Sequence, residues 1–382
     1  MTALGLAANI PALCLTSVSG EFGLGASLGG TFLSALFWGI GLSLLVIGPL
    51  ADRTGFRAPL IVSAILEAAG LFWVAEAHSF RALCCGAFLT GLGIGTADAL
   101  ATPLACALYR EQRTRVTNIL HSFYPVGMIL AILLALFLMD RWLSWRGMYR
   151  LIGVLCLPPA VIFCFPSLPS HAHEGAERLT SRRLVRSPVF WILGAAIFLT
   201  GMSELGPAQW LPAFVEKVAG LSPDASAAAD PLRAPRMGMF GMLLYGLAMT
   251  AGRTGSAWAA RRFTASAMLS IGSAIVAGGL LLACALPQAW AAIAFLAVSG
   301  LGVAALWPTT LALAGDRFPQ AGASMFALLP AMGNLGGVTG PLVIGFVAEV
   351  ASLRAGMAVL AAPPLLIILL VRRLQLRAWE PA

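Results

Sequence analysis

Charged side chains are scarce in this chain of 382 residues. Asp, Glu, Lys and Arg together make up 10% of it, whereas 59% is hydrophobic. A water-soluble domain usually carries about 25% charged residues. So few charges cannot cover a water-exposed surface of this size, so membrane lipid must cover much of it. The composition therefore excludes an ordinary soluble protein and indicates an integral membrane protein.

Motifs of the common enzyme classes are absent as well. The sequence has no G-x-x-x-x-G-K-[ST] loop, so ATP does not drive this chain alone. It has neither a G-x-S-x-G elbow nor an H-E-x-x-H pair. The run Gly91–Gly95 is glycine-rich, but it lies in an expected membrane helix and not after a strand. We therefore expect no enzyme activity, no cofactor and no metal.

Disulfide and nucleic-acid chemistry are also excluded. The seven cysteines lie in apolar runs and form no C-x-x-C pair, so we interpret them as free thiols. The net charge of +8 comes mostly from arginines in short loops between apolar runs, where topology signals belong. No basic stripe with interleaved aromatics occurs, so we expect no nucleic acid among the partners.

Apolar runs of membrane-spanning length recur along the whole chain, since one span needs roughly 20 apolar residues. Twelve helices are expected, over residues 3–20, 29–50, 58–77, 81–109, 117–139, 146–166, 188–216, 236–258, 265–286, 289–314, 322–348 and 353–375. The fold class predicted is an all-α integral membrane protein with two pseudo-symmetric six-helix halves. The halves are 1–166 and 188–382, joined by a polar cytoplasmic linker over 167–187.

The distribution of arginines predicts the orientation. With both termini in the cytoplasm, the cytoplasmic loops hold about twice as many basic residues as the opposite face. A cluster on the opposite face, Arg141, Arg146 and Arg150, runs against the rule. We expect a monomeric multi-pass protein of the inner (plasma) membrane. The chain begins almost inside an apolar run, which suggests a short or incomplete amino terminus.

The two halves carry matching glycine landmarks. Gly91-Leu92-Gly93-Ile94 recurs 209 residues later as Gly300-Leu301-Gly302-Val303, and Gly48 recurs 207 residues later as Gly255. Two landmarks that share nearly one offset indicate an internal duplication. Repeated halves are typical of transporters that bind solute near the bilayer midplane between the repeats.

A glycine-rich motif stands between the second and third expected helices, as Gly48-Pro49-Leu50-Ala51-Asp52-Arg53-Thr54-Gly55-Phe56-Arg57. Its glycines allow a tight turn, and its acid can meet a helix amino terminus or a basic partner. The motif resembles the G-x-L-a-D-r-x-G-r signature of the major facilitator superfamily, in which it latches the cytoplasmic side. The resemblance implies a cytoplasmic gate at Gly48, Asp52, Arg53, Gly55 and Arg57. The alternative is a plain turn with topology-setting arginines.

The second half has a counterpart without the acid, Gly252-Arg253-Thr254-Gly255 followed by Arg261-Arg262-Phe263. This form resembles the fucose:proton symporter branch of the same superfamily and its sugar-transporting relatives. It extends the implied gate to Gly252, Arg253 and Arg262. Three further runs support the branch: Gly201-Met202-Ser203-Glu204, His121-Ser122-Phe123-Tyr124-Pro125 and Trp307-Pro308-Thr309-Thr310.

Two acids inside expected spans are the candidate proton-coupling residues, Asp98 and Glu204, because carboxylates in a bilayer are costly and usually functional. Asp98 has no basic residue within two turns of its own helix, and burial favours its protonated form. In the fucose symporter family a carboxylate lies five residues before the helix-4 proline, and Asp98 has that spacing from Pro103. The alternative is a structural acid between packed helices.

Glu204 is followed by Trp210, whose indole offers an apolar face and one donor. An aromatic face against a sugar ring, with carboxylates bonding its hydroxyls, would bind such a solute. The alternative is that Glu204 caps a helix break near Gly206-Pro207. The fucose symporter family has another carboxylate in helix 1, where this chain has Ala12, so its two-carboxylate scheme is incomplete unless Glu204 substitutes.

Weaker polar candidates complete the predicted solute site, although each could serve packing or the membrane interface instead. They are Asn9, His121, Tyr124, Trp307 and Asn334, beside Asp98, Glu204 and Trp210.

The predicted function is secondary active transport of a small solute, a sugar or similar polar metabolite, by alternating access and proton symport. The alternative is a drug or metabolite:proton antiporter of the same fold. A membrane sensor is disfavoured because the linker and the tail are short. The sequence does not identify the solute.

Overall fold

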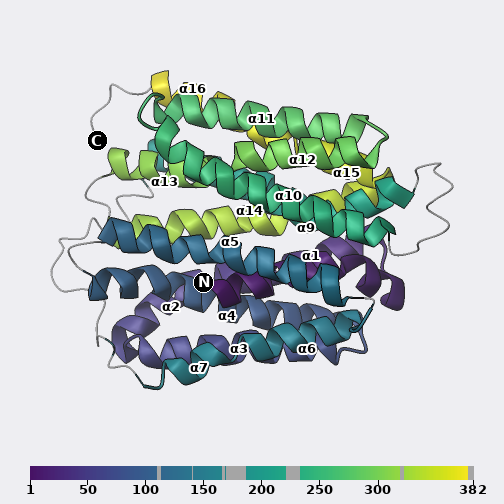
Figure 1. Ribbon diagram of the computed structural model, residues 1–382. Helices are drawn as coiled ribbons and strands as arrows, with labels where there is room; N and C mark the ends of the chain where they lie inside the picture. The colour runs from purple at the N-terminus through teal and green to yellow at the C-terminus, as the bar shows by residue number, and fades with distance from the viewer. Residues whose placement is uncertain are drawn as a thin grey trace. The chain divides into compact units, whose positions relative to one another are not determined.

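The computed structural model describes residues 1–109, 113–139, 141–165, 168, 186–220, 233–318 and 322–376. Every regular element in these ranges is a helix, as Figure 1 shows, which confirms the all-α prediction. Ten helices in the described ranges are long and apolar enough to cross a membrane.

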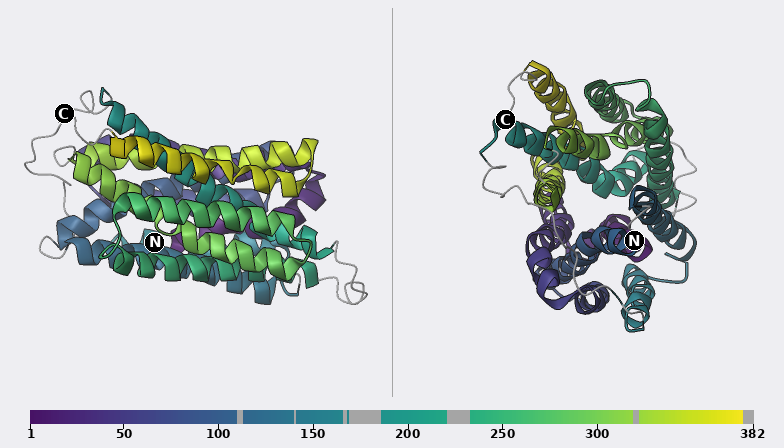
Figure 2. Two further views of the ribbon diagram at one scale, coloured as in Figure 1. Left: turned by 90° about the horizontal axis from the view of Figure 1, so that it is seen from above. Right: turned by 90° about the vertical axis from the view of Figure 1, so that its left-hand side faces the viewer.

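The chain divides into two compact units, Met1–Leu24 with Thr31–Ala176 and Gly25–Gly30 with Glu177–Ala382. In chain order the first seven helices are α1 (Thr2–Phe22), α2 (Ala26–Thr54), α3 (Arg57–Ala75), α4 (Phe80–Leu108), α5 (Arg113–Leu138), α6 (Trp145–Leu155) and α7 (Pro158–Ile162). All but the start of α2 belong to the first unit. Within each unit the long helices run alongside one another as a bundle (Figure 2).

The second unit contains the remaining helices. They are α9 (Pro188–Gly220), α10 (Arg233–Ala259), α11 (Ala265–Ala285), α12 (Ala289–Val303), α13 (Leu306–Arg317), α14 (Gly322–Val350), α15 (Leu353–Val359) and α16 (Ala362–Leu376). Each of the twelve predicted spans overlaps one of the helices in these two sets or two consecutive ones. The predicted linker over 167–187 lies outside the described residues, except for positions 168, 186 and 187.

Three predicted spans are each broken into two helices, and each break precedes a proline. The span over 146–166 breaks before Pro158, that over 289–314 at Ala304–Ala305, and that over 353–375 before Pro363. Proline lacks the N–H that would bond the carbonyl four residues earlier, and its ring crowds that carbonyl. Ala304 is the residue four positions before Pro308, which explains the break between α12 and α13.

No break occurs near Gly206-Pro207, where one interpretation of the sequence placed it. The α9 helix runs without interruption through Pro207 and Pro212. Glu204 therefore lies inside a continuous helix, so the interpretation of this acid as the cap of a helix break is wrong.

Glycine contacts repeat in the two units at the offset seen in the sequence. Gly91 lies against the backbone carbonyl of Leu36, and 209 residues later Gly300 lies against that of Tyr245. Residues without a side chain at these positions let helices approach closely. The duplication is therefore present in the packing as well as in the sequence.

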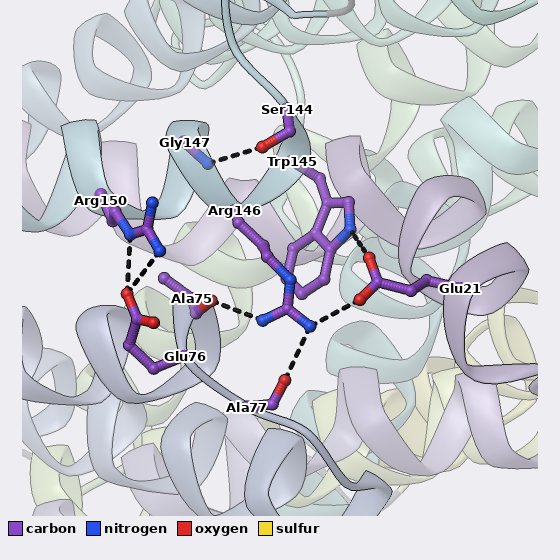
Figure 3. A network of polar contacts seen from close by, with 9 residues as sticks. All are labelled: Glu21, Ala75, Glu76, Ala77, Ser144, Trp145, Arg146, Gly147 and Arg150. Carbon is purple, nitrogen blue, oxygen red and sulfur yellow. Dashed lines mark hydrogen bonds and ion pairs between the residues drawn. The ribbon is translucent and has the colours of Figure 1, made fainter.

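Arg146 at the start of α6 holds three helices of the first unit together (Figure 3). Its guanidinium donates to the carbonyl oxygens of Ala75 at 2.6 Å and Ala77 at 2.8 Å, at the end of α3. It also pairs with Glu21 at the end of α1 at 2.6 Å and stacks over the Trp145 ring. Figure 3 also shows Arg150 paired with Glu76. Two of the arginines that violate the charge rule thus have carboxylate partners.

The second unit contains the same clamp. Arg354, 208 residues after Arg146, donates to the carbonyl oxygens of Cys284 at 2.9 Å and Leu286 at 2.8 Å, at the end of α11. The serine before each short helix also repeats, because Ser144 accepts from the Gly147 N–H and Ser352 from the Ala355 N–H. In each unit an arginine of the last predicted span thus caps the exposed carbonyls of the third.

Candidate functional site

An ion pair inside the second unit is the centre of the candidate site. Glu204 projects from the middle of α9 and is 9% exposed. Its Oε1 lies 3.1 Å from Nη2 of Arg253 on α10. The phenol of Tyr245, also on α10, donates to the backbone carbonyl of Glu204 at 3.5 Å. Helices α9 and α10 therefore meet at a charged pair.

Each side chain of this pair has one buried polar atom that takes no part in a hydrogen bond with the described residues. Oε2 of Glu204 and Nε of Arg253 have no hydrogen-bond partner among the described residues. A buried donor or acceptor without a partner costs roughly 1–3 kcal/mol, and more for a charged group. The pairing reduces the cost of enclosing two charges, but it leaves one acceptor and one donor that a bound group could satisfy.

Trp210 lies on the same helix, but its indole is committed to packing. It is 5% exposed, and its Nε1 donates to the carbonyl oxygen of Pro341 on α14 at 3.2 Å. The single donor of the indole is thus in use. In this conformation Trp210 fixes α9 against α14 and presents no open ring face to a solute.

Asp98 lies in the first unit beside a hydroxyl and an imidazole. It is half-buried on α4, and His121 of α5 is near enough to act on it electrostatically. Oγ1 of Thr102, one turn further along α4, lies 2.8 Å from Nε2 of His121. Residues four apart share a helix face, so Asp98, Thr102 and His121 form one polar cluster between α4 and α5. The ring of His121 is exposed, whereas Asp98 is more enclosed.

A second acid of the first unit is more deeply enclosed. Glu67 on α3 is 1% exposed, and its Oε1 has no partner in the described part of the chain. Its backbone lies against Gly93 of α4. The thiol of Cys156, the residue that follows α6, lies close enough to interact with its carboxyl group.

Most of the remaining solute-site candidates form hydrogen bonds within their own helix or pack against apolar residues. The amide of Asn9 donates to the Gly5 carbonyl at 2.8 Å, and that of Asn334 to the Pro330 carbonyl at 3.0 Å. Trp307 packs in an apolar cluster with its ring over Gly333. Tyr124 is half-buried on α5.

The first gate motif forms the turn that its glycines predict. Gly55 has a positive φ of 73°, and its N–H bonds the Ala51 carbonyl at 2.8 Å, which ends α2. Phe56 is buried with Ile47 and neighbouring residues and anchors the turn, while Arg53 and Arg57 are exposed. Gly48 lies within α2, and the side chain of Asp52 lies outside the described part of the structure.

The residues of the second motif lie in two different environments, one exposed and one inside the second unit. Arg262 is exposed, and its guanidinium lies 4.7 Å from the centre of the Trp258 ring. Gly252 lies against the Leu301 carbonyl, just before the break between α12 and α13. Arg253, predicted from the sequence as part of the gate, points to Glu204 instead. One signal in the sequence could have indicated this, since an acid enclosed in a membrane needs a partner from a neighbouring helix.

The helices, their two units and the repeated contacts define a membrane transporter built from two duplicated halves. The chain belongs to the major facilitator superfamily, whose family model matches residues 1–243 and 232–380. It is therefore a multi-pass transporter that carries a small-molecule solute and is not an enzyme. The predicted fold class and family are confirmed.

Relatives and solved structures agree with this assignment. The chain is 24% identical to the membrane protein MosC of Rhizobium meliloti over 85% of its length and 76% of that protein. It is 29% identical to a D-xylose transporter of Levilactobacillus brevis, over 37% of this chain and 31% of that one.

Two solved structures share the fold. A bacterial homologue of the human lysosomal transporter Spinster, inward-facing and occupied, has a TM-score of 0.79 at 15% identity, covering 100% of this chain and 96% of that one. A variant of the fucose:proton symporter FucP of E. coli has a TM-score of 0.65 at 17% identity, covering 97% of this chain and 96% of that one.

Proposed function

We propose that this protein is a proton-coupled symporter for a small polar solute such as a sugar. The observation that carries the proposal is the Glu204–Arg253 pair, which encloses one free acceptor and one free donor in the described part of the second unit. The similarity to a D-xylose transporter and the fold shared with a fucose:proton symporter support the solute class.

The proton would be taken up at the carboxyl groups of Asp98 and Glu204. Exposed His121 and the Thr102 hydroxyl give Asp98 a route for a proton through hydrogen-bonding groups. A proton on Glu204 removes the negative charge that holds Arg253, so protonation changes the site that the solute meets. Coupling follows if the loaded and the empty carrier can reorient while the half-loaded carrier cannot.

The cycle would follow alternating access between the halves 1–166 and 188–382, with the linker and both termini cytoplasmic, in a monomer of the inner membrane. Solute contacts would come from Glu204 and Asp98, with Asn334, Trp307, Tyr124, His121 and Asn9 as further candidates. Trp210 would act by positioning α9, because its indole is bonded to α14. The two motifs at Gly55 and Gly252 would serve as the cytoplasmic gate.

Uptake into proteoliposomes tests the proposal. With labelled D-xylose and L-fucose as probes, an inward proton gradient of one pH unit should drive roughly tenfold accumulation. Asp98→Asn should abolish the accumulation and leave solute counterflow. The control Asp316→Asn, which changes an exposed carboxyl group near the end of α13, should keep both. Accumulation by Asp98→Asn with unaltered pH dependence would remove Asp98 from the coupling role.

A second candidate function is proton-driven efflux of drugs or metabolites. It is favoured by three buried methionines on α10, the helix of Arg253: Met239, Met242 and Met249. Methionine side chains adapt to apolar ligands of different shape. Increased tolerance of an expressing strain to several unrelated compounds would favour this function over uptake.

A further inference from the structure

The free acceptor and the free donor of the candidate site belong to two side chains that are already joined. Oε2 of Glu204 and Nε of Arg253 are both buried and have no partner among the described residues, while Oε1 and Nη2 of the same groups lie 3.1 Å apart. A group that bound there would have to donate to the carboxylate and accept from the guanidinium.

The chemistry of ligands narrows what such a group can be. A hydroxyl both donates and accepts, and a carboxamide does the same with its nitrogen and oxygen. A carboxylate only accepts and would be repelled by Glu204, and an ammonium only donates and would be repelled by Arg253. The pair is therefore suited to an uncharged group.

The surroundings hold the pair in place and leave one side open. The Arg253 side chain is 34% exposed and that of Glu204 is 11% exposed, so the arginine side of the pair is the more open one, while Nε of Arg253 and Oε2 of Glu204 are themselves buried. Tyr245, 2% exposed, contacts the Glu204 backbone and fixes α10 against α9. Gly252 beside the Leu301 carbonyl fixes the backbone next to Arg253 from the other direction.

We propose that Arg253, together with Glu204, determines specificity by binding an uncharged solute group, a hydroxyl or a carboxamide, and rejecting carboxylates and amines. This inference rests on the proposed function, because it assigns the solute chemistry of the same site. It moves Arg253 from the cytoplasmic gate to the solute site.

The test measures equilibrium binding to the purified full-length protein in detergent. The probes are neutral sugars (D-xylose, L-fucose, D-glucose), glucuronate and glucosamine. The unmodified protein should bind at least one neutral sugar and bind both charged probes more weakly. Arg253→Gln should weaken the affinity for neutral sugars at least about tenfold. It should also raise the affinity for glucosamine relative to that for neutral sugars, because the carboxylate of Glu204 is left unpaired. Glu204→Gln should shift preference towards glucuronate in the same way.

Control variants separate specificity from folding. Arg261→Gln removes an exposed arginine near the end of the same helix and should leave all affinities unchanged. Glu204→Gln with Arg253→Gln restores neutrality, and this double variant should remain monodisperse and prefer neither charged probe. The inference is overturned if both single variants weaken all probes by the same factor, if a charged probe binds the unmodified protein best, or if no neutral sugar binds.

The result that would refute the proposed function differs from the result that would refute this inference. A protein that binds neutral sugars as expected but moves none across proteoliposomes would refute symport and leave the specificity of the pair intact. Proton symport of an acid or an amine would uphold symport and refute the specificity proposed for the pair.

Discussion

At the residue scale, Gly55 ends α2 in a backbone conformation that favours glycine. Its φ of 73° is costly for any residue with a Cβ. Gly55→Ala should therefore lower the free energy of unfolding by about 1–2 kcal/mol, measured as a lower Tm in a thermal unfolding assay.

The matched control for this substitution is Gly278→Ala. Gly278 lies inside α11, and a Cβ there would meet no atom within 4 Å. Alanine favours a helix more than glycine does, so the Tm should stay level or rise. An equal fall in Tm for Gly55→Ala and Gly278→Ala would show that a side chain does not strain the turn at Gly55.

Glu204 and Arg253 are 49 residues apart in the chain, and their side chains meet at 3.1 Å. The sequence identifies the acid, because carboxylates inside apolar spans are rare and costly. It does not identify the arginine as the partner, since that depends on how α9 and α10 are rotated against each other. For the same reason the sequence suggested an open indole at Trp210, whereas the donor of that ring is bonded to α14.

At the element scale, the sequence predicted where spans lie but not all of their breaks. Proline positions are visible in the sequence, yet α9 continues through Pro207 and Pro212 while the span over 289–314 breaks before Pro308. Neighbouring helices decide whether the freed carbonyl is tolerated, and one chain's sequence does not show those neighbours. The arginine clamps were missed in a similar way, because in the sequence Arg146 is only a violation of the charge rule.

The clamp at Arg146 should be worth more than the neighbouring pair at Arg150. Arg146 is 19% exposed and bonds two carbonyl groups as well as Glu21, whereas the side chains of Arg150 and Glu76 are 52% and 62% exposed. Arg146→Lys should destabilise the protein by about 1–3 kcal/mol, because one ammonium cannot reach the same three oxygens in a fixed fork.

Arg150→Gln is the control for that prediction and should cost under about 1 kcal/mol, as exposed pairs do. Thermal unfolding of both variants, with Arg354→Lys for the second unit, gives the comparison. A Tm for Arg146→Lys equal to that for Arg150→Gln would mean that the clamp does not hold α1, α3 and α6 together.

At the scale of the whole molecule, the fold was predictable and the solute was not. Apolar runs, a polar stretch and a shared offset near 208 residues are enough to define two duplicated halves, which the family match confirms. The solute depends on which side chains converge on one space, and that follows from packing that no single motif records.

The two halves should also assemble into a working transporter when they are made as two separate chains. Most helices belong to one unit, and apart from Gly25–Gly30 the boundary falls between Ala176 and Glu177. Fragments 1–176 and 177–382, expressed together with a tag on one, should co-purify and restore part of the solute uptake. Recovery of the tagged fragment alone, with uptake absent, would contradict this expectation.

The repeated clamp has a consequence for how the protein is made. Arg146 reaches back 71 residues to Ala75, and Arg354 reaches back 70 residues to Cys284. While the ribosome is still synthesising the chain, the end of the third span in each half waits uncapped until the last span of that half emerges. Each half is therefore finished only when its final predicted span is made, and a nascent chain stalled before Arg146 or Arg354 has no arginine to cap these carbonyl groups.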